Sequence, residues 1–94
     1  MKLTVEISLY PMREEYVPPI RDFIELINGY AGLRVTTYPT CTVIVGEFDA
    51  VMAALAEAMK ESYRRFGMGV FVTKFLSGYD AEHPESESSG DAEA

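Results

Sequence analysis

The strand predicted at residues 3–11 has two chemically different faces, and this alternation constrains the fold more than any other feature of the chain. Successive side chains of a strand point to opposite sides of its sheet. The apolar set is Leu3, Val5, Ile7 and Leu9, and the polar set is Thr4, Glu6, Ser8 and Tyr10. Such a strand is half buried, with a core on one side. Its polar side is a candidate site.

Two amphipathic helices are predicted further along the chain. The first begins near Pro18 and Pro19, because proline suits the first helical turn, and it stops near Gly29. Its apolar residues recur at helical spacing: Ile20, Phe23, Ile24 and Ile27. The second helix is predicted to follow an N-cap at Asp49 and to end at Gly67. Its predicted buried stripe is Met52, Leu55, Met59, Tyr63 and Phe66.

Three more strands are predicted at residues 33–38, 41–48 and 70–76, where branched and aromatic residues gather. The first two are joined as a hairpin, and the last is apolar on both faces, which favours a central position or cover by a partner. The order strand, helix, strand, strand, helix, strand is that of the split βαβ arrangement. We therefore predict an α+β, ferredoxin-like βαββαβ sandwich: a four-stranded antiparallel sheet with two helices on one face.

The end of the chain has a different composition. Residues 80–94 contain six acids and no lysine or arginine, and so little apolar surface cannot offset the entropy cost of ordering. The predicted domain is therefore 1–78, and 79–94 is predicted to be a disordered acidic tail. Without the tail, the remaining charge is 8 minus 9, or minus 1. A nearly neutral body lacks the positive field that attracts nucleic acid, so no nucleic-acid partner is expected.

Cysteine and histidine are too few for several kinds of site. One cysteine, Cys41, excludes an internal disulfide, and the one histidine lies in the predicted tail, so neither a metal site nor a cofactor is expected. No signal peptide or long apolar run is visible, which favours a cytoplasmic protein without membrane insertion. The small size of the predicted domain favours oligomerisation.

Glu6 is the first candidate for a specific role, because a carboxylate in a central strand is costly to desolvate without a partner. It either pairs with Arg34, Lys74 or a second subunit, or holds a nitrogen-rich ligand. A second candidate group surrounds the end of the first strand and the hairpin turn. Its hydroxyls and aromatic faces suit a flat heteroaromatic ring, although threonines are also ordinary strand residues. The group is Tyr10, Thr36, Thr37, Tyr38, Thr40 and Thr42.

Four blocks of sequence, taken together, resemble the small thiamine-binding, or YkoF-like, protein family. They are residues 6–11, 33–42, 46–52 and 70–76, and the likeness spans residues 3–78. The resemblance implies a ferredoxin-like domain that assembles into dimers or tetramers. It also implies binding of thiamine, or of its hydroxymethylpyrimidine portion, without conversion and therefore without enzyme activity.

The resemblance also implies ligand-facing residues. In the first block they are Glu6, Ser8 and Tyr10, and in the hairpin block they are Thr37, Thr40, Cys41 and Thr42, with Tyr10 or Tyr38 covering the ring. Glu6 is expected to balance the thiazolium charge or to share a proton with the pyrimidine. The family's hairpin commonly reads threonine, asparagine, any residue, methionine, serine, threonine. Here residues 37–42 read Thr-Tyr-Pro-Thr-Cys-Thr, which removes the asparagine amide.

The function expected from the sequence is non-enzymatic binding of thiamine or hydroxymethylpyrimidine by a cytoplasmic homodimer or homotetramer. The alternative is an oligomeric scaffold or regulatory protein with no small-molecule ligand. A third hypothesis makes Glu6 a general base. It is the weakest of the three, because no second catalytic group is visible beside that carboxylate.

Overall fold

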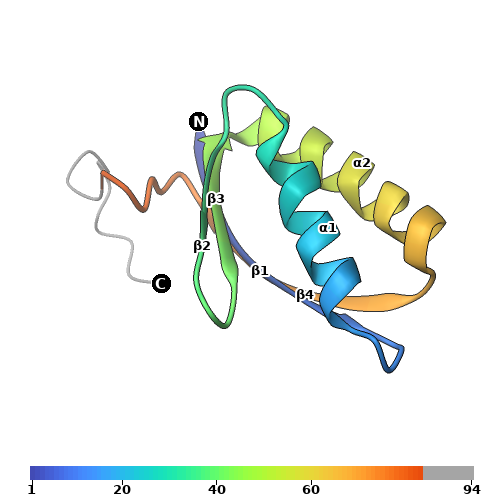
Figure 1. Cartoon of the computed structure of the whole chain (residues 1–94). Coiled ribbons are helices and arrows are strands. Elements are labelled where there is room, and N and C mark those ends of the chain that lie inside the picture. The colour runs from blue at the N-terminus through green and yellow to red at the C-terminus, as the bar shows by residue number, and fades with distance from the viewer. Residues whose placement is uncertain (84–94) are drawn as a thin grey trace.

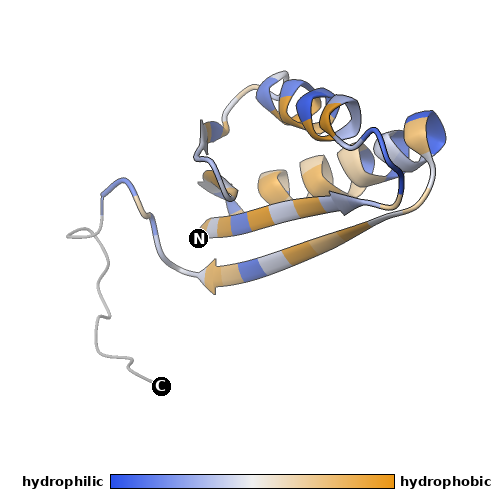
Figure 2. Cartoon of the chain, turned by 60° about the horizontal axis from the view of Figure 1, so that its bottom comes forward, coloured by the Kyte–Doolittle hydropathy of each residue, from blue (hydrophilic) through white to orange (hydrophobic). Residues whose placement is uncertain are grey.

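The computed structural model describes residues 1–83 of the 94-residue chain. Its elements, in chain order (Figure 1), are β1 (Lys2–Pro11), α1 (Val17–Asn28), β2 (Arg34–Thr37), β3 (Thr42–Glu47), α2 (Phe48–Phe66) and β4 (Gly69–Ser77). Both helices lie on the same side of the sheet (Figure 2). This arrangement confirms the predicted ferredoxin-like α+β fold.

The four strands form one sheet in the order β2-β3-β1-β4, and each neighbouring pair is antiparallel. β2 and β3 form the predicted hairpin. β4 is an edge strand, which excludes the predicted central position, and the alternative of cover by a partner stays a prediction. Val70 and Val72 lie opposite Tyr10 and Ser8 of β1 and are 40% and 55% exposed. The structure therefore leaves apolar side chains of this edge strand open to solvent.

The core confirms the alternation of β1. Leu3, Val5 and Ile7 are at most 2% exposed and pack with Phe23 and Ile27 of α1, among others. The ring of Phe23 also lies 5.0 Å from that of Phe71 on β4, measured between centroids. β1 therefore contributes its apolar side to the core.

α2 packs on the sheet through a different stripe from the predicted one. Its buried residues are Val51, Ala54, Leu55, Ala58 and Ser62. Met52, Met59 and Tyr63 are exposed, so of the predicted stripe only Leu55 is fully buried. The predicted N-cap is also wrong by two residues, because the cap is Glu47 and Asp49 lies in the first turn. Gly29 caps α1 with a φ of −80°, outside the left-handed region.

The chain after β4 turns at Gly78, whose φ is +78°. It then returns across the open sheet face, which is the face opposite the two helices. We call residues Tyr79–His83 the strap. The Thr4 hydroxyl donates to the Tyr79 carbonyl at 2.7 Å and accepts from the Ala81 N–H at 3.1 Å. Thr4 is only 3% exposed as a result. The folded part of the chain therefore continues to His83, beyond the boundary predicted at residue 78, and residues 84–94 of the predicted tail lie outside the described residues.

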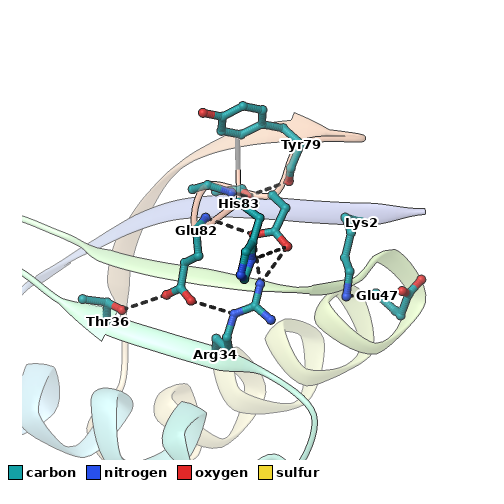
Figure 3. A network of polar contacts seen from close by, with 10 residues as sticks. Lys2, Arg34, Thr36, Glu47, Tyr79, Glu82 and His83 are labelled. Carbon is teal, nitrogen blue, oxygen red and sulfur yellow. Dashed lines mark hydrogen bonds and ion pairs between the residues drawn. The ribbon is translucent and has the colours of Figure 1, made fainter. Parts of the chain in front are cut away.

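Arg34 holds the strap from β2 (Figure 3). Its Nη2 donates to both carboxylate oxygens of Asp80, at 2.9 and 2.8 Å, and its Nε lies 2.7 Å from Glu82 Oε1. The Asp80 side chain is 7% exposed and also accepts from the Glu82 N–H at 2.9 Å. Asp80, an acid of the predicted tail, is therefore buried and anchors the strap, because Arg34 on β2 pairs with its carboxylate.

The contribution of the strap to stability should depend on pH. Burial raises the pKa of the Asp80 carboxyl, but hydrogen bonds from Arg34 and the Glu82 N–H, with the Arg34 charge, leave it below its ordinary value. A carboxyl whose pKa is lower in the folded state than in the unfolded state stabilises the folded state. This contribution is complete at pH values above the ordinary pKa, and it is lost as the pH falls through the lowered pKa. We expect the difference in thermal midpoint between wild type and Asp80→Asn to shrink below about pH 4. A difference unchanged down to about pH 2 would contradict this account.

Candidate functional site

A cavity of about 470 Å³ opens between the end of β1, the start of α1 and the turn that joins β2 to β3. Small-molecule sites typically measure about 300–1,000 Å³, so this volume suits a small organic ligand. The lining includes residues from both sides of β1, among them Ile7, Ser8 and Tyr10. The cavity therefore wraps around the end of the strand and does not lie on the polar sheet face alone.

The hairpin turn forms one wall and is tied to β1. The Tyr38 N–H donates to the Cys41 carbonyl at 2.8 Å, which closes the turn. The Ser8 hydroxyl donates to the Thr40 carbonyl at 2.9 Å, so the turn is anchored to the neighbouring strand. Ser8 uses its proton in this bond and keeps its lone pairs for a ligand. The wall is thus pre-formed by one hydrogen bond within the backbone and one from a side chain to the backbone.

Two threonines carry hydroxyls at the base of this wall. Thr37 and Thr42 are opposite each other in the β2–β3 register, and their hydroxyl oxygens lie 3.4 Å apart. Thr42 is 6% exposed. A hydroxyl both donates and accepts, so this pair can adapt to either kind of ligand atom.

The opposite wall is apolar, and the rim is aromatic. Its apolar lining residues are Ile20, Phe23 and Ile24 of α1 together with Ile7 and Leu9 of β1. The rim tyrosines are each more than half exposed: Tyr10, Tyr16 and Tyr38. Aromatic faces beside an apolar wall favour a flat ring, while the hydroxyls supply directed hydrogen bonds.

The structure brings together seven of the nine candidate residues predicted from the sequence. The lining residues among them are Ser8, Tyr10, Thr37, Tyr38, Thr40, Cys41 and Thr42. Glu6 is not among them. Its side chain is 43% exposed, and one carboxylate oxygen lies 3.4 Å from Lys74 Nζ on β4. Of the alternatives for Glu6, the geometry agrees with pairing to Lys74. Thr36 also lies away from the cavity, where its hydroxyl faces Glu82 at 3.4 Å.

Sequence reasoning missed the part of the lining that precedes and opens α1. Arg13 and Tyr16 come from the loop after β1, and the helix adds Ile20, Phe23 and Ile24. The helical spacing of the isoleucines did predict an inward face. No local pattern showed that the start of this face would meet the hairpin turn instead of the core.

Arg13 is the one residue with a formal charge among the described lining residues. Its guanidinium carbon lies 5.5 Å from the centroid of the Phe66 ring, which is the geometry of a cation–π contact. Its Nη2 lies 4.0 Å from a carboxylate oxygen of Glu15, whose side chain is 81% exposed. Water screens so exposed a pair, so Glu15 neutralises little of the arginine charge.

Two further properties concern the described residues only. Within residues 1–83, no three histidine, cysteine or acidic side chains are grouped so as to hold a metal ion. No helix of this part combines the length and the apolar character needed to cross a membrane.

These features define the class of protein: a small ferredoxin-like domain with a pre-formed pocket between its first helix and its β-hairpin. No protein-family model and no curated protein sequence matches the chain. The likeness to known proteins is therefore structural.

Solved structures share the fold over most of its length. A protein from Streptococcus pneumoniae has a TM-score of 0.77 at 22% identity, covering 83% of this chain and 88% of that one. A Thermotoga maritima protein, described as a candidate thiamine biosynthesis/salvage protein, has a TM-score of 0.75 at 24% identity, covering 87% of both chains. A hypothetical protein from Methanocaldococcus jannascii has a TM-score of 0.70 at 26% identity, covering 81% of this chain and 79% of that one.

Proposed function

We propose that this protein binds thiamine, or its hydroxymethylpyrimidine moiety, without converting it, as a cytoplasmic homodimer or homotetramer. The observation that carries the proposal is the cavity, where hydroxyls, an apolar wall and aromatic rims converge on a space suited to a small ligand. The four sequence blocks and the description of the Thermotoga maritima neighbour point to the same ligand class.

The chemistry of an aminopyrimidine fits this lining. Its edge presents a donor amine beside ring nitrogens that accept hydrogen bonds, and its faces are flat and apolar. The Thr37 and Thr42 hydroxyls can serve the edge, since each donates and accepts. Tyr10 or Tyr38 can cover a face of the ring. Glu6 lies outside the lining, where its carboxylate is 3.4 Å from Lys74 Nζ.

The open sheet face supports assembly into an oligomer. The strap covers Thr4 on this face, but Tyr10, Val70 and Val72 remain exposed side by side on β1 and β4. A contiguous apolar patch on a small domain is typical of an interaction surface. The same patch supports the alternative function, a scaffold whose open face serves only its subunit contacts and whose cavity takes no ligand.

Titration calorimetry of the full-length protein with hydroxymethylpyrimidine tests the proposal. We expect saturable binding and a thermal midpoint that rises with ligand concentration, because a ligand that binds only the folded state stabilises it by mass action. Tyr10→Ala removes an aromatic face at the rim and should weaken binding about tenfold. The matched control is Tyr63→Ala, since Tyr63 is 67% exposed on α2 and does not line the cavity.

The two functions give different outcomes. A scaffold would show neither heat of binding nor a thermal shift with hydroxymethylpyrimidine or thiamine, while sedimentation still reports an oligomer. Binding that Tyr10→Ala and Tyr63→Ala leave equally strong would place the ligand outside this cavity.

A further inference from the structure

The charge at the cavity is opposite to the one that a cationic ligand requires. Among its described lining residues there is one arginine, and no aspartate or glutamate. The remaining polar groups are hydroxyls, a thiol and backbone groups, which carry no formal charge. Thiamine combines a neutral aminopyrimidine with a positively charged thiazolium, so only part of that molecule matches the lining.

The carboxylate expected to balance a thiazolium lies elsewhere. Glu6 lies outside the lining and already faces Lys74 at 3.4 Å. Arg13 faces the carboxylate of Glu15, which lies at 4.0 Å and is 81% exposed. A charge that water solvates on most sides contributes little at short range. No acid of the described chain is therefore placed within the cavity to pair with a bound cation.

Arg13 lines the cavity, and a contact with a neighbouring aromatic ring restrains its side chain. Its guanidinium lies over the ring of Phe66 at the end of α2, and its side chain is 38% exposed. A cation–π contact restricts the guanidinium without neutralising it. Arginine stays protonated at all working pH values and presents several N–H donors, which suit phosphate oxygens well.

We propose that Arg13 makes this cavity select aminopyrimidines by charge, favouring a phosphate monoester over the neutral alcohol and disfavouring cationic thiamine. The inference rests on the proposed function and deepens it. Its physical basis is Coulombic. An anionic substituent beside the arginine gains an opposite charge in a partly dehydrated site, whereas a thiazolium brings a like charge toward it.

The experiment compares three probes on the full-length protein by calorimetry: hydroxymethylpyrimidine, its phosphate monoester and thiamine. We expect the phosphate ester to bind about tenfold more tightly than the alcohol, and thiamine to bind about tenfold more weakly. Higher ionic strength should weaken the phosphate ester selectively, since salt screens its charge. Arg13→Gln should bring the three affinities together, Arg13→Glu should reverse their order, and Arg13→Lys should keep it.

Arg21→Gln is the matched control, because Arg21 is exposed on α1 and does not line the cavity. It removes the same charge from the same region and should leave the order of affinities unchanged. The thermal midpoint of each variant shows whether it is folded.

The outcomes separate the two proposals. Equal affinities for the three probes in wild type, or the same order in Arg13→Gln as in wild type, would overturn the charge selection while the pyrimidine site stands. An equal effect of Arg21→Gln would assign the preference to net charge and would overturn the role of Arg13. Failure of all three probes to bind wild type would overturn the proposed function and this inference together.

Discussion

Ile27→Ala is expected to lower the free energy of unfolding by about 2–5 kcal/mol. Ile27 is fully buried in the core beneath α1, so truncation removes apolar contacts and leaves a cavity. The loss cannot come from the helix itself, because alanine has a higher helix propensity than isoleucine. A folded part of this size has about 4–12 kcal/mol of total stability. One truncation therefore removes a large share of it.

Urea unfolding followed by circular dichroism measures this effect, with Val17→Ala as the control. Val17 is an apolar residue of the same helix, but it is 46% exposed. Its truncation should change the free energy of unfolding by no more than about 0.5 kcal/mol. Equal losses for the two variants would mean that α1 does not pack on the sheet through Ile27.

The packing of α2 shows why local patterns predict an element better than its buried face. The helix was predictable, but the predicted stripe consisted of large apolar residues. The face that meets the sheet instead carries Val51, Ala54 and Ala58 beside Leu55. Small side chains permit a close approach between helix and sheet. The choice of the buried face therefore depends on the spacing between the two layers and not on hydropathy. Met52 and Met59 are left on the outer side.

β1 and the candidate site also differ in how far the sequence predicts them. Strict alternation was enough to place Leu3, Val5 and Ile7 in the core, because a period of two depends only on neighbouring residues. The cavity depends on three segments that are distant in sequence. Hydroxyls near the hairpin were visible as a group, whereas Arg13 showed no pattern of its own. Its relevance appears only when the loop after β1 is placed beside the turn at Tyr38.

The strap shows a limit of composition as a guide. Acidic, polar sequence without large apolar residues predicts disorder when each residue is considered alone. Asp80 instead meets Arg34 on the sheet, and the Thr4 hydroxyl bonds to two backbone groups of the strap. Arg34 and Asp80 are 46 residues apart, so the pairing is a property of the tertiary structure.

Arg34→Met is expected to release the strap while the rest of the domain stays folded. The substitution keeps an apolar stem of similar length and removes the cation that donates to both Asp80 oxygens. A buried carboxylate is costly without that charge-assisted pair. The core beneath the sheet does not include Arg34. Detachment of residues 79–83 therefore needs no rupture of the core.

Hydrogen exchange at the Ala81 amide measures this release directly, because its N–H is bonded to the Thr4 hydroxyl in the attached strap. We expect exchange at least about tenfold faster in Arg34→Met than in wild type, with core amides of β1 little changed. Arg64→Met is the matched control, since Arg64 is 70% exposed and pairs with Glu61 on α2. Adding Asp80→Leu to Arg34→Met should slow the exchange again. The attached strap then no longer buries a carboxylate that lacks a cationic partner. Exchange at Ala81 that is as slow in Arg34→Met as in Arg64→Met would show that the strap is held by its backbone contacts with Thr4 and not by the ion pair.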